Sequence, residues 1–411
     1  MNLFTTKMEK FLKPTINIEN LGFEKGAHLI LKRSLQKISV GEELTITGFD
    51  TEWQPQVSAW CRAEGHAVHF STVERKVFAH LKRGSAQENR WQDVQSTGHS
   101  DLRMAQAVKE EAKATWGLAA RGAKVEAGSA DFHFRLNHKT EVWSDNIAEL
   151  YSQALAAQWN PNTALDWTPP QSHSDELEEA IVQIMTYLVE NENAALLIPA
   201  RFLGQLHPHF REVQALLAVQ IADEARHIEV FTRRIGVHGR EPALSTAGGQ
   251  ASLKTLLDEP DFSTAGFLLS VLGEGTFVNL LQFIASVAPD PLTQQIAQLA
   301  SRDESRHVAF GMSHLLHRLE KEPEFRECLS AATLHRYESL AHTQGLNAEV
   351  FDALLLLAAG SFTPSAVAQG YKKVQVLLRE MAEGRRTRLI RLGFSPQEAE
   401  HLSTLHTRNF M

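Results

Sequence analysis

The sequence predicts a mainly helical protein, with a four-helix bundle, additional C-terminal helices and a small N-terminal α/β domain. From Val142 onward, apolar residues recur every three or four positions, which is the period of an amphipathic helix. Before residue 83 the pattern is helical in part and alternating in part. Residues 83–101 are polar and rich in turn formers. The predicted bounds are therefore a domain at 1–83, a linker with a connecting helix at 84–140, and a helical domain at 141–411.

Composition and charge exclude several classes of protein. The 411 residues are 43% hydrophobic and 22% charged, as in soluble globular proteins, and a net charge of -8 argues against a nucleic-acid or basic membrane-binding face. The longest apolar run, residues 353–359, falls short of the roughly 20 residues that span a bilayer. Two cysteines, Cys61 and Cys328, exclude a disulfide framework or a Cys-rich metal site. We expect a cytoplasmic protein without a signal peptide.

The N-terminal domain reads as a short alternation of helices and strands. Helical spacing and a following glycine predict a helix over residues 29–38, and a second helix over 57–65 also ends at a glycine. Alternating apolar residues predict strands over 43–48, 67–70 and 73–81.

The rest of the chain reads almost entirely as helix. Residues 102–120 are predicted helical, a helix capped at Ser144 or Asp145 runs to Trp159, and Ser174 opens a long helix after a Pro-rich connection. Further helices are predicted at about 209–235, 262–286, 290–320, 328–344, 348–358, 364–383 and 396–408.

Two of these helices carry the same five-residue pattern, Asp-Glu-x-Arg-His, at residues 223–227 and 303–307. In each copy the Glu and the His are three residues apart, so both side chains lie on one helix face, one turn apart. A single Glu-x-x-His commonly marks a solvated face, but two identical copies favour a shared metal site. The two pairs are Glu224 with His227 and Glu304 with His307.

A ferritin-like metal site requires one further Glu from each of the other two helices of the bundle. An antiparallel neighbour should place it about thirty residues upstream, given a rise of about 1.5 Å per residue. Glu192 lies 32 residues before Glu224, and Glu274 lies 30 residues before Glu304. Glu190 competes with Glu192, but Glu192 continues the apolar face of its helix.

Buried carboxylates at one depth of a bundle require cations. Four Glu and two neutral His suit iron or manganese and not a structural zinc. Two divalent cations neutralise four carboxylates, so we predict two iron ions, with manganese or a mixed Mn/Fe pair left open. The predicted ligands are Glu192, Glu224, His227, Glu274, Glu304 and His307; Asp223 and Asp303 are predicted to accept hydrogen bonds from liganding imidazoles and to pair with Arg226 and Arg306.

Other residues in this region receive structural interpretations. His207 and His209 flank a proline and are typical of a capping turn, and His314 is interpreted as a core residue because it lies about 10 Å along the axis from His307. Gly273 and Gly275 flank Glu274 inside a helix, which indicates a close helix approach, a local bulge or a plain packing notch.

The spacing of these motifs resembles that of the oxygenase subunits of bacterial multicomponent di-iron monooxygenases and, more broadly, of ferritin-like di-iron carboxylate proteins. The resemblance covers about residues 140–320 and implies two irons at the six matched positions, O2 reduction and oxidation of an organic substrate in an adjacent apolar pocket. Val278 stands where the monooxygenases carry Thr, and Ala300 stands where the N-oxygenases carry an additional His.

Residues 20–82 resemble the TusA/SirA sulfur-carrier fold through Leu31-x-x-x-Leu35, Gly41-Glu42-x-Leu44 and the segment at 59–66. The Cys-Pro motif that precedes the first helix in that family is absent, and residues 23–26 stand there. Cys61 lies on the second predicted helix and is interpreted as a small buried hydrophobe.

The leading hypothesis is an O2-dependent di-iron oxidase or oxygenase acting on a small organic substrate. Electrons would come from a separate reductase or a reducing substrate, because the sequence has no Gly-rich dinucleotide motif. The alternatives are ferritin-like iron storage or detoxification, and a scaffold whose N-terminal domain recruits a sulfur-relay partner. The C-terminal helices would shape the pocket or the face of a homodimer.

Overall fold

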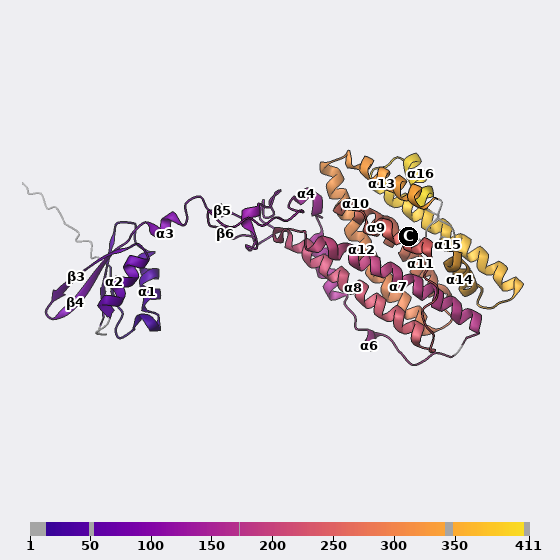
Figure 1. The fold of residues 1–411 in the computed structure, drawn as a ribbon, viewed down its shortest axis with the longest axis horizontal. Coiled ribbons are helices and arrows are strands. Elements are labelled where there is room, and N and C mark those ends of the chain that lie inside the picture. Colours follow the sequence, from indigo (N-terminus) through magenta and orange to yellow (C-terminus); the bar gives the residue numbers. More distant parts are fainter. Residues whose placement is uncertain (1–13, 49–52, 172, 342–347, 407–411) are drawn as a thin grey trace, which may run out of the picture. The chain divides into compact units, whose positions relative to one another are not determined.

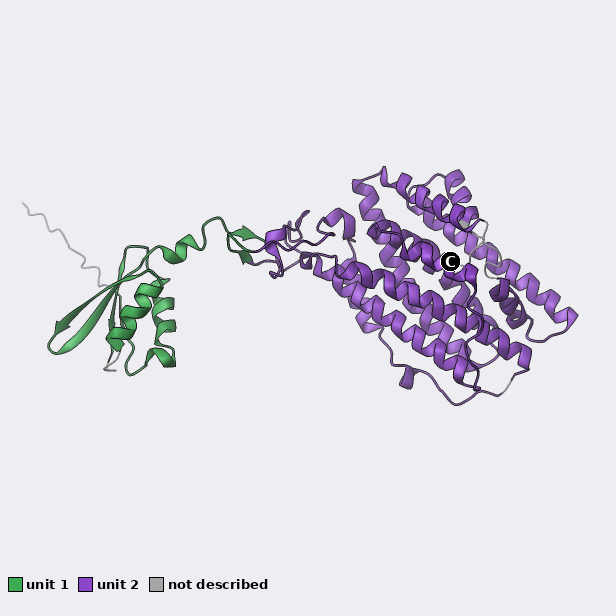
Figure 2. Ribbon diagram, viewed as in Figure 1, with its two compact units in different colours: residues 1–96, 124–129 green, residues 97–123, 130–411 purple. Residues whose placement is uncertain are grey.

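The structure is a computed structural model that describes residues 14–48, 53–171, 173–341 and 348–406. Contacts divide the chain into two compact units, residues 1–96 with 124–129 and residues 97–123 with 130–411 (Figure 2). The first unit holds a small mixed sheet, and the second is almost entirely helical (Figure 1). The predicted fold class, a mainly helical bundle with a small N-terminal domain, is confirmed. The predicted domain bounds stay predictions.

The first unit is a four-stranded sheet in the order β1-β2-β4-β3. β1 is parallel to β2, and the other two pairings are antiparallel. Leu31 and Cys61 pack with Leu44 and Leu81 in one buried cluster that joins the helices to the sheet. Cys61 is buried as predicted, while the likeness to sulfur carriers stays a prediction. The bounds are β1 Thr15–Asn17, α1 Ala27–Leu35, β2 Glu43–Thr47, α2 Trp53–Ala63, β3 Ala67–Val73 and β4 Lys76–Lys82, followed by α3 Ala86–Asn89, β5 Gln95–Ser96 and β6 Lys124–Val125.

The helix predicted over residues 102–120 is wrong. The segment consists of turns and one short 3-10 helix, Ala114–Trp116. Its backbone groups find partners elsewhere in the chain: Ala112 N donates to Asn137 O at 2.8 Å, and Lys109 N donates to His209 Nε2 at 2.8 Å. These tertiary bonds override a moderate helix propensity.

Four long helices form the core of the second unit. They are α7 Asp175–Leu203, α8 Arg211–Gly236, a composite helix from Phe262 to Val287, and α12 Pro291–Lys321. The composite helix comprises α10 Phe262–Gly266, a π-helical segment η4 Phe267–Glu274, and α11 Gly275–Val287. Short connections bring α7 beside α8 and α11 beside α12. This arrangement is a ferritin-like bundle.

The helix starts follow from capping residues in the sequence. The predicted cap Ser174 accepts a hydrogen bond from Leu177 N at the start of α7. Asp290 accepts one from Thr293 N at the start of α12, where Pro291 occupies the first turn. The helix predicted at Ser144 or Asp145 begins instead at Ile147, after Asn146.

The remaining helices surround the bundle. The C-terminal helices are present, although α15 extends eight residues further than expected, to Arg391, and the predicted helix ends at 344 and 408 lie outside the described residues. The helix α9 was not predicted, because glycines at 248 and 249 interrupt its apolar pattern. The bounds are α4 Lys139–Val142, α5 Ile147–Ala156, α6 Pro161–Ala164, α9 Ala247–Leu257, α13 Phe325–Leu340, α14 Ala348–Ala359, α15 Pro364–Arg391 and α16 Pro396–His406.

The composite helix Phe262–Val287 is long and apolar enough to cross a membrane by length and composition. However, 78% of its most apolar window is buried inside the protein. The core helix of a soluble bundle has the same properties. The bent pair α14 and α15 also passes this test when it is taken as one broken span.

A buried cluster of charged residues connects α7, α8 and the start of α12 near one end of the bundle. Arg234 of α8 is fully buried and donates to Glu178 Oε1 of α7 at 2.7 Å and to Asp290 Oδ2 at 3.0 Å. Arg234 Nε also donates to Thr293 Oγ1 of α12 at 2.7 Å. The guanidinium therefore compensates two buried carboxylates at once.

Replacing this arginine should strongly destabilise the bundle. Arg234→Met leaves Glu178 and Asp290 buried without their cation, so we expect a loss of about 3–5 kcal/mol in the free energy of unfolding. Urea denaturation measures the loss. The control is Arg240→Met, which breaks the exposed pair with Asp175 and should cost less than about 1 kcal/mol. Equal losses in the two variants would contradict the assignment.

Candidate metal centre

Six side chains converge at one depth between the four core helices. Glu192 comes from α7, Glu224 and His227 from α8, Glu274 from the last position of η4, and Glu304 with His307 from α12. All six are at most 5% exposed. Their ligand atoms form two groups in which every atom lies within 4.8 Å of the others. The groups are Glu192, Glu224, His227 and Glu304, and Glu224, Glu274, Glu304 and His307.

Glu224 and Glu304 belong to both groups. His227 Nδ1 lies 3.1 Å from Glu224 Oε2 and 3.3 Å from Glu304 Oε1. His307 Nδ1 lies 3.0 Å from the other oxygen of Glu224 and 3.4 Å from the other oxygen of Glu304. Each of these two carboxylates thus offers one oxygen to each imidazole, as expected of ligands shared by two cations.

The other two glutamates belong to one group each. Glu192 Oε1 lies 3.4 Å from His227 Nδ1, whereas Glu274 belongs to the group of His307. Gln220 Nε2 donates to Glu274 Oε1 at 3.2 Å, so one oxygen of Glu274 is held by a neutral amide. The site therefore has two halves with one private carboxylate each.

The chemistry of the donor atoms fits a pair of cations. Among the described residues, the inward-facing atoms of the cluster are buried and make no hydrogen bond of acceptable geometry, although the imidazole Nδ1 atoms lie 3.0–3.4 Å from carboxylate oxygens. Native proteins leave few buried polar groups unsatisfied, so a concentration of them at one point indicates a ligand. These atoms are Glu192 Oε1, both oxygens of Glu224, His227 Nδ1, Glu274 Oε2, both oxygens of Glu304 and His307 Nδ1.

The shifted pKa values of the cluster also indicate a site for cations. Burial and the charge of Glu304 raise the pKa of Glu192 and of Glu274 well above the ordinary range of a carboxyl. Burial lowers the pKa of His227, but the Glu192 carboxylate and other neighbours raise it further, so the net pKa lies well above its ordinary value. Without metal, protons must neutralise this cluster, and cations binding there would displace them.

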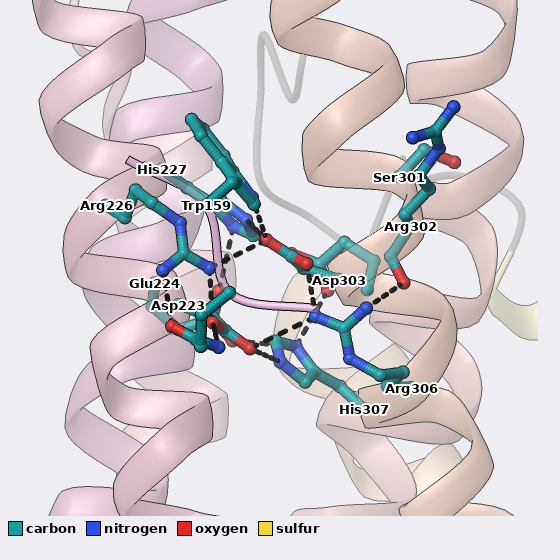
Figure 3. A network of polar contacts seen from close by, with 12 residues as sticks. Trp159, Asp223, Glu224, Arg226, His227, Ser301, Arg302, Asp303, Arg306 and His307 are labelled. Atoms are coloured by element: carbon teal, nitrogen blue, oxygen red, sulfur yellow. Dashed lines mark hydrogen bonds and ion pairs between the residues drawn. The ribbon is translucent and has the colours of Figure 1, made fainter. Parts of the chain in front are cut away.

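The two copies of the pentapeptide are linked crosswise. His227 Nε2 lies 3.1 Å from Asp303 Oδ2, and His307 Nε2 lies 3.3 Å from Asp223 Oδ2 (Figure 3). Each imidazole thus contacts the aspartate of the other helix, which leaves Nδ1 facing the glutamates. Donation from Nε2–H to a carboxylate orients a ligand imidazole and raises its basicity. The sequence predicted the contact type but not the crossed partners.

The two arginines bridge the same aspartates. Arg226 pairs with Asp223 in its own helix and with Asp303 at 2.9 Å, while Arg306 pairs with Asp303 and lies 3.6 Å from Asp223. The two guanidinium groups and the two aspartate carboxylates therefore form a compact charged network on the outer side of the imidazoles (Figure 3). It ties α8 to α12.

Two residues that follow α5 complete this network and were missed in the sequence. Trp159 Nε1 donates to Asp303 Oδ2 at 2.8 Å, and Gln158 Nε2 donates to Asp223 Oδ1 at 2.8 Å. The Arg226 guanidinium lies 4.7 Å from the Trp159 ring centroid. A tryptophan before a Pro-rich stretch carries no spacing signal that relates it to Arg226 or Asp303, which lie 67 and 144 positions away.

Three neighbouring residues considered from the sequence lie outside the metal centre. Glu190 lies outside both ligand groups. The His207 side chain accepts from His209 N, which is the predicted capping turn. His314 contacts Ser263 Oγ at 2.7 Å and Trp143 O at 2.9 Å and is not a member of either group. Burial lowers the pKa of His314 to about 4, so it is neutral.

The local distortion expected beside Glu274 is present. The backbone from Phe267 to Glu274 is π-helical, and Glu274 is its last residue. Such wide turns occur often at functional sites. At Gly275 the neighbour is a side chain and not the backbone of a second helix, because an added Cβ would overlap the guanidinium of Arg388, so the predicted close helix approach is not seen there.

Comparisons with known proteins give structural likenesses only. No protein-family model and no curated protein matches the chain. A protein with aldehyde deformylating oxidase activity from Synechococcus is 18% identical, over 58% of this chain and 98% of that chain, with a TM-score of 0.40. An R2-like ligand-binding oxidase from Sulfolobus acidocaldarius is 15% identical, over 62% and 93%, with a TM-score of 0.39.

A variant of an R2-like ligand-binding oxidase with an anaerobically reconstituted Mn/Fe cofactor is 16% identical, over 57% of this chain and 93% of that chain, with a TM-score of 0.42. Values this low do not decide what the present chain binds or does. The case for a metal centre rests on the donor atoms described above.

The choice between Glu192 and Glu190 provides a test of the ligand set. Glu192→Gln removes a carboxylate private to one half, so we expect the protein to lose about one of two bound metal ions per chain, because neutral amides are weak ligands for hard cations. Glu190→Gln is the matched control and should retain both. Metal analysis after iron loading and desalting measures the content. Normal content in Glu192→Gln would remove Glu192 from the set.

Proposed function

We propose that this chain is an O2-dependent oxidase or oxygenase that uses two iron ions and acts on a small organic substrate. The observation that carries the proposal is the pair of overlapping ligand groups that share Glu224 and Glu304. Such carboxylate-bridged pairs in ferritin-like bundles hold iron or manganese. Glu192 and His227 would hold one ion, and Glu274 and His307 the other, with manganese or a mixed Mn/Fe pair as variants.

The bound metals would supply the oxygen chemistry, and the protein would supply their position and surroundings. Asp303 and Asp223 orient the imidazoles through Nε2. Apolar packing on all four helices keeps bulk water from the ligand atoms. Gln220 places a neutral donor against Glu274 and leaves that carboxylate a single free oxygen.

A small cavity lined by Gln220, the residue that donates to Glu274, supports a reaction with a small molecule. Its volume is about 30 Å³, and its polar lining includes Gln220, Ser270 and His314. That volume exceeds the ~10–15 Å³ that one water requires and suits a molecule of the size of O2. An organic substrate would need side chains to move aside. The apolar lining consists of Ile198, Pro199, Phe202, Leu217, Phe262, Gly266, Leu269, Phe310 and Gly311.

The setting of the reaction is part of the proposal. We place the protein in the cytoplasm, with a separate reductase or a reducing substrate as electron source, and with the C-terminal helices at the pocket or at a homodimer face. In an alternative proposal, the small N-terminal unit would recruit a sulfur-relay partner and the helical unit would serve as its scaffold.

The central experiment is iron loading without oxygen. The purified chain should bind about two Fe(II) ions, consume O2 on exposure to air and develop ferric absorption. Glu224→Ala removes a ligand from both halves at once, so both the metal content and the O2 uptake should fall to background. A metal content near zero in the unaltered protein, or unchanged uptake in Glu224→Ala, would overturn the proposal.

Size in solution separates this function from iron storage. A monomer or dimer that turns over O2 with a reductant favours an oxidase. A large hollow oligomer that accumulates iron far beyond two ions per chain would favour the storage alternative. Size-exclusion chromatography with light scattering, followed by iron analysis of the same peak, distinguishes the two.

A further inference from the structure

Two arginines of α15, one buried and one partly buried, lie against the segment that carries Glu274, although α15 is not one of the four core helices. Arg385 is 1% exposed, and Arg388 is intermediate in exposure. Within the described part of the chain, no carboxylate forms an ion pair with either side chain. Of the other buried arginines, Arg234 and Arg121 each have a carboxylate partner, whereas Arg336 donates to Ser252 and Thr255.

Stability alone does not account for this pair. A buried cation without a counter-charge is costly, and apolar residues of similar volume are often neutral or better. Burial and the neighbouring charge of Arg388 lower the pKa of Arg385 to about 9, and burial lowers that of Arg388 to about 10. Their contacts indicate what the two residues do instead.

Arg388 supplies a hydrogen bond that the π-helical turn takes away. In an α-helix, the N–H of Gly275 would donate to the carbonyl four residues back, which belongs to Val271. Here Gly275 N donates to Ser270 O, five residues back. Arg388 Nε donates to Val271 O at 2.7 Å. The side chain from α15 therefore satisfies the carbonyl that the wide turn passes over.

The glycine at position 275 leaves the space that the Arg388 side chain occupies. A Cβ on Gly275 would overlap the guanidinium of Arg388, so a larger residue would force the arginine to move. One residue further on, Arg385 Nη1 donates to Thr276 Oγ1 at 3.1 Å, and that hydroxyl donates to Leu272 O at 2.7 Å. Contacts from α15 thus lie on both sides of Glu274 in the sequence.

We propose that Arg388, assisted by Arg385, is a positioning residue for Glu274. It fixes the π-helical turn, and the turn sets where the Glu274 carboxylate lies in the metal centre. This inference rests on the proposed function, because it assumes that Glu274 binds a metal. Glu274 belongs to only one of the two ligand groups, so α15 acts on the half of the centre that contains His307.

The test is a cobalt titration of the full-length protein. Co(II) serves as a spectroscopic probe that does not react with O2 on binding to carboxylate sites, and its absorption reports coordination. We expect Arg388→Met to weaken one of two Co(II) sites about tenfold or more, as loss of a supporting partner commonly does, and to leave the other unchanged. Arg388→Lys should recover part of the loss, since an ammonium still donates to Val271 O.

Two further variants keep the test decisive. Gly275→Ala should reproduce the one-site loss, because its methyl group displaces Arg388 without removing it, and it stands in if Arg388→Met fails to fold. The matched control is Arg386→Met, an exposed neighbour on α15 that lies 3.6 Å from Glu400, and it should bind both ions normally.

The outcomes separate this inference from the proposed function. If the unaltered protein fails to bind two Co(II) ions, the metal assignment itself falls. If it binds two, and Arg388→Met and Gly275→Ala bind both as tightly, only the positioning role falls. Equal weakening of both sites together with a lower melting temperature would indicate general destabilisation and would also overturn the positioning role.

Discussion

Four carboxylates buried at one level of a helical bundle constrain everything around them. Glu192, Glu224, Glu274 and Glu304 repel one another, and the imidazoles of His227 and His307 and the amide of Gln220 are too few to balance their charge, so the fold is compatible with them only if cations or protons neutralise them. The imidazoles, aspartates and arginines around them form alternating positive and negative contacts that offset part of this charge. The bundle is thus organised around charge compensation at its centre and around apolar packing elsewhere.

Much of this could be predicted because it is encoded locally. Helix starts follow from capping residues such as Ser174, and the positions of the six converging side chains follow from two repeated pentapeptides and the length of an antiparallel helix pair. What could not be predicted depends on contacts between distant residues. The segment 102–120 bonds to residues near 137 and 209 and so is not helical, and Trp159 reaches Asp303 across 144 positions.

The crossed contacts between the two copies of the pentapeptide illustrate the same limit. Identical residues on two helices allow each aspartate to serve its own histidine or that of the other helix. Residues three apart point from the same face of one helix, but His227 directs Nδ1 inward and Nε2 toward the facing helix, where Asp303 lies. Only the relative placement of α8 and α12 decides between these arrangements, and that placement is a tertiary property.

The repeated motif gives the centre an approximate internal symmetry that its surroundings break. Within the ranges that the structure describes, Trp159 donates its indole N–H to Asp303 and not to Asp223, and of the four glutamates Glu274 alone accepts from an amide and lies at the end of a π-helical turn. The two halves of the metal centre therefore differ chemically, although their predicted ligands are nearly the same. A protein given a single equivalent of metal would bind it mainly in one half of the centre. Two different metals would each prefer one half and would not distribute at random.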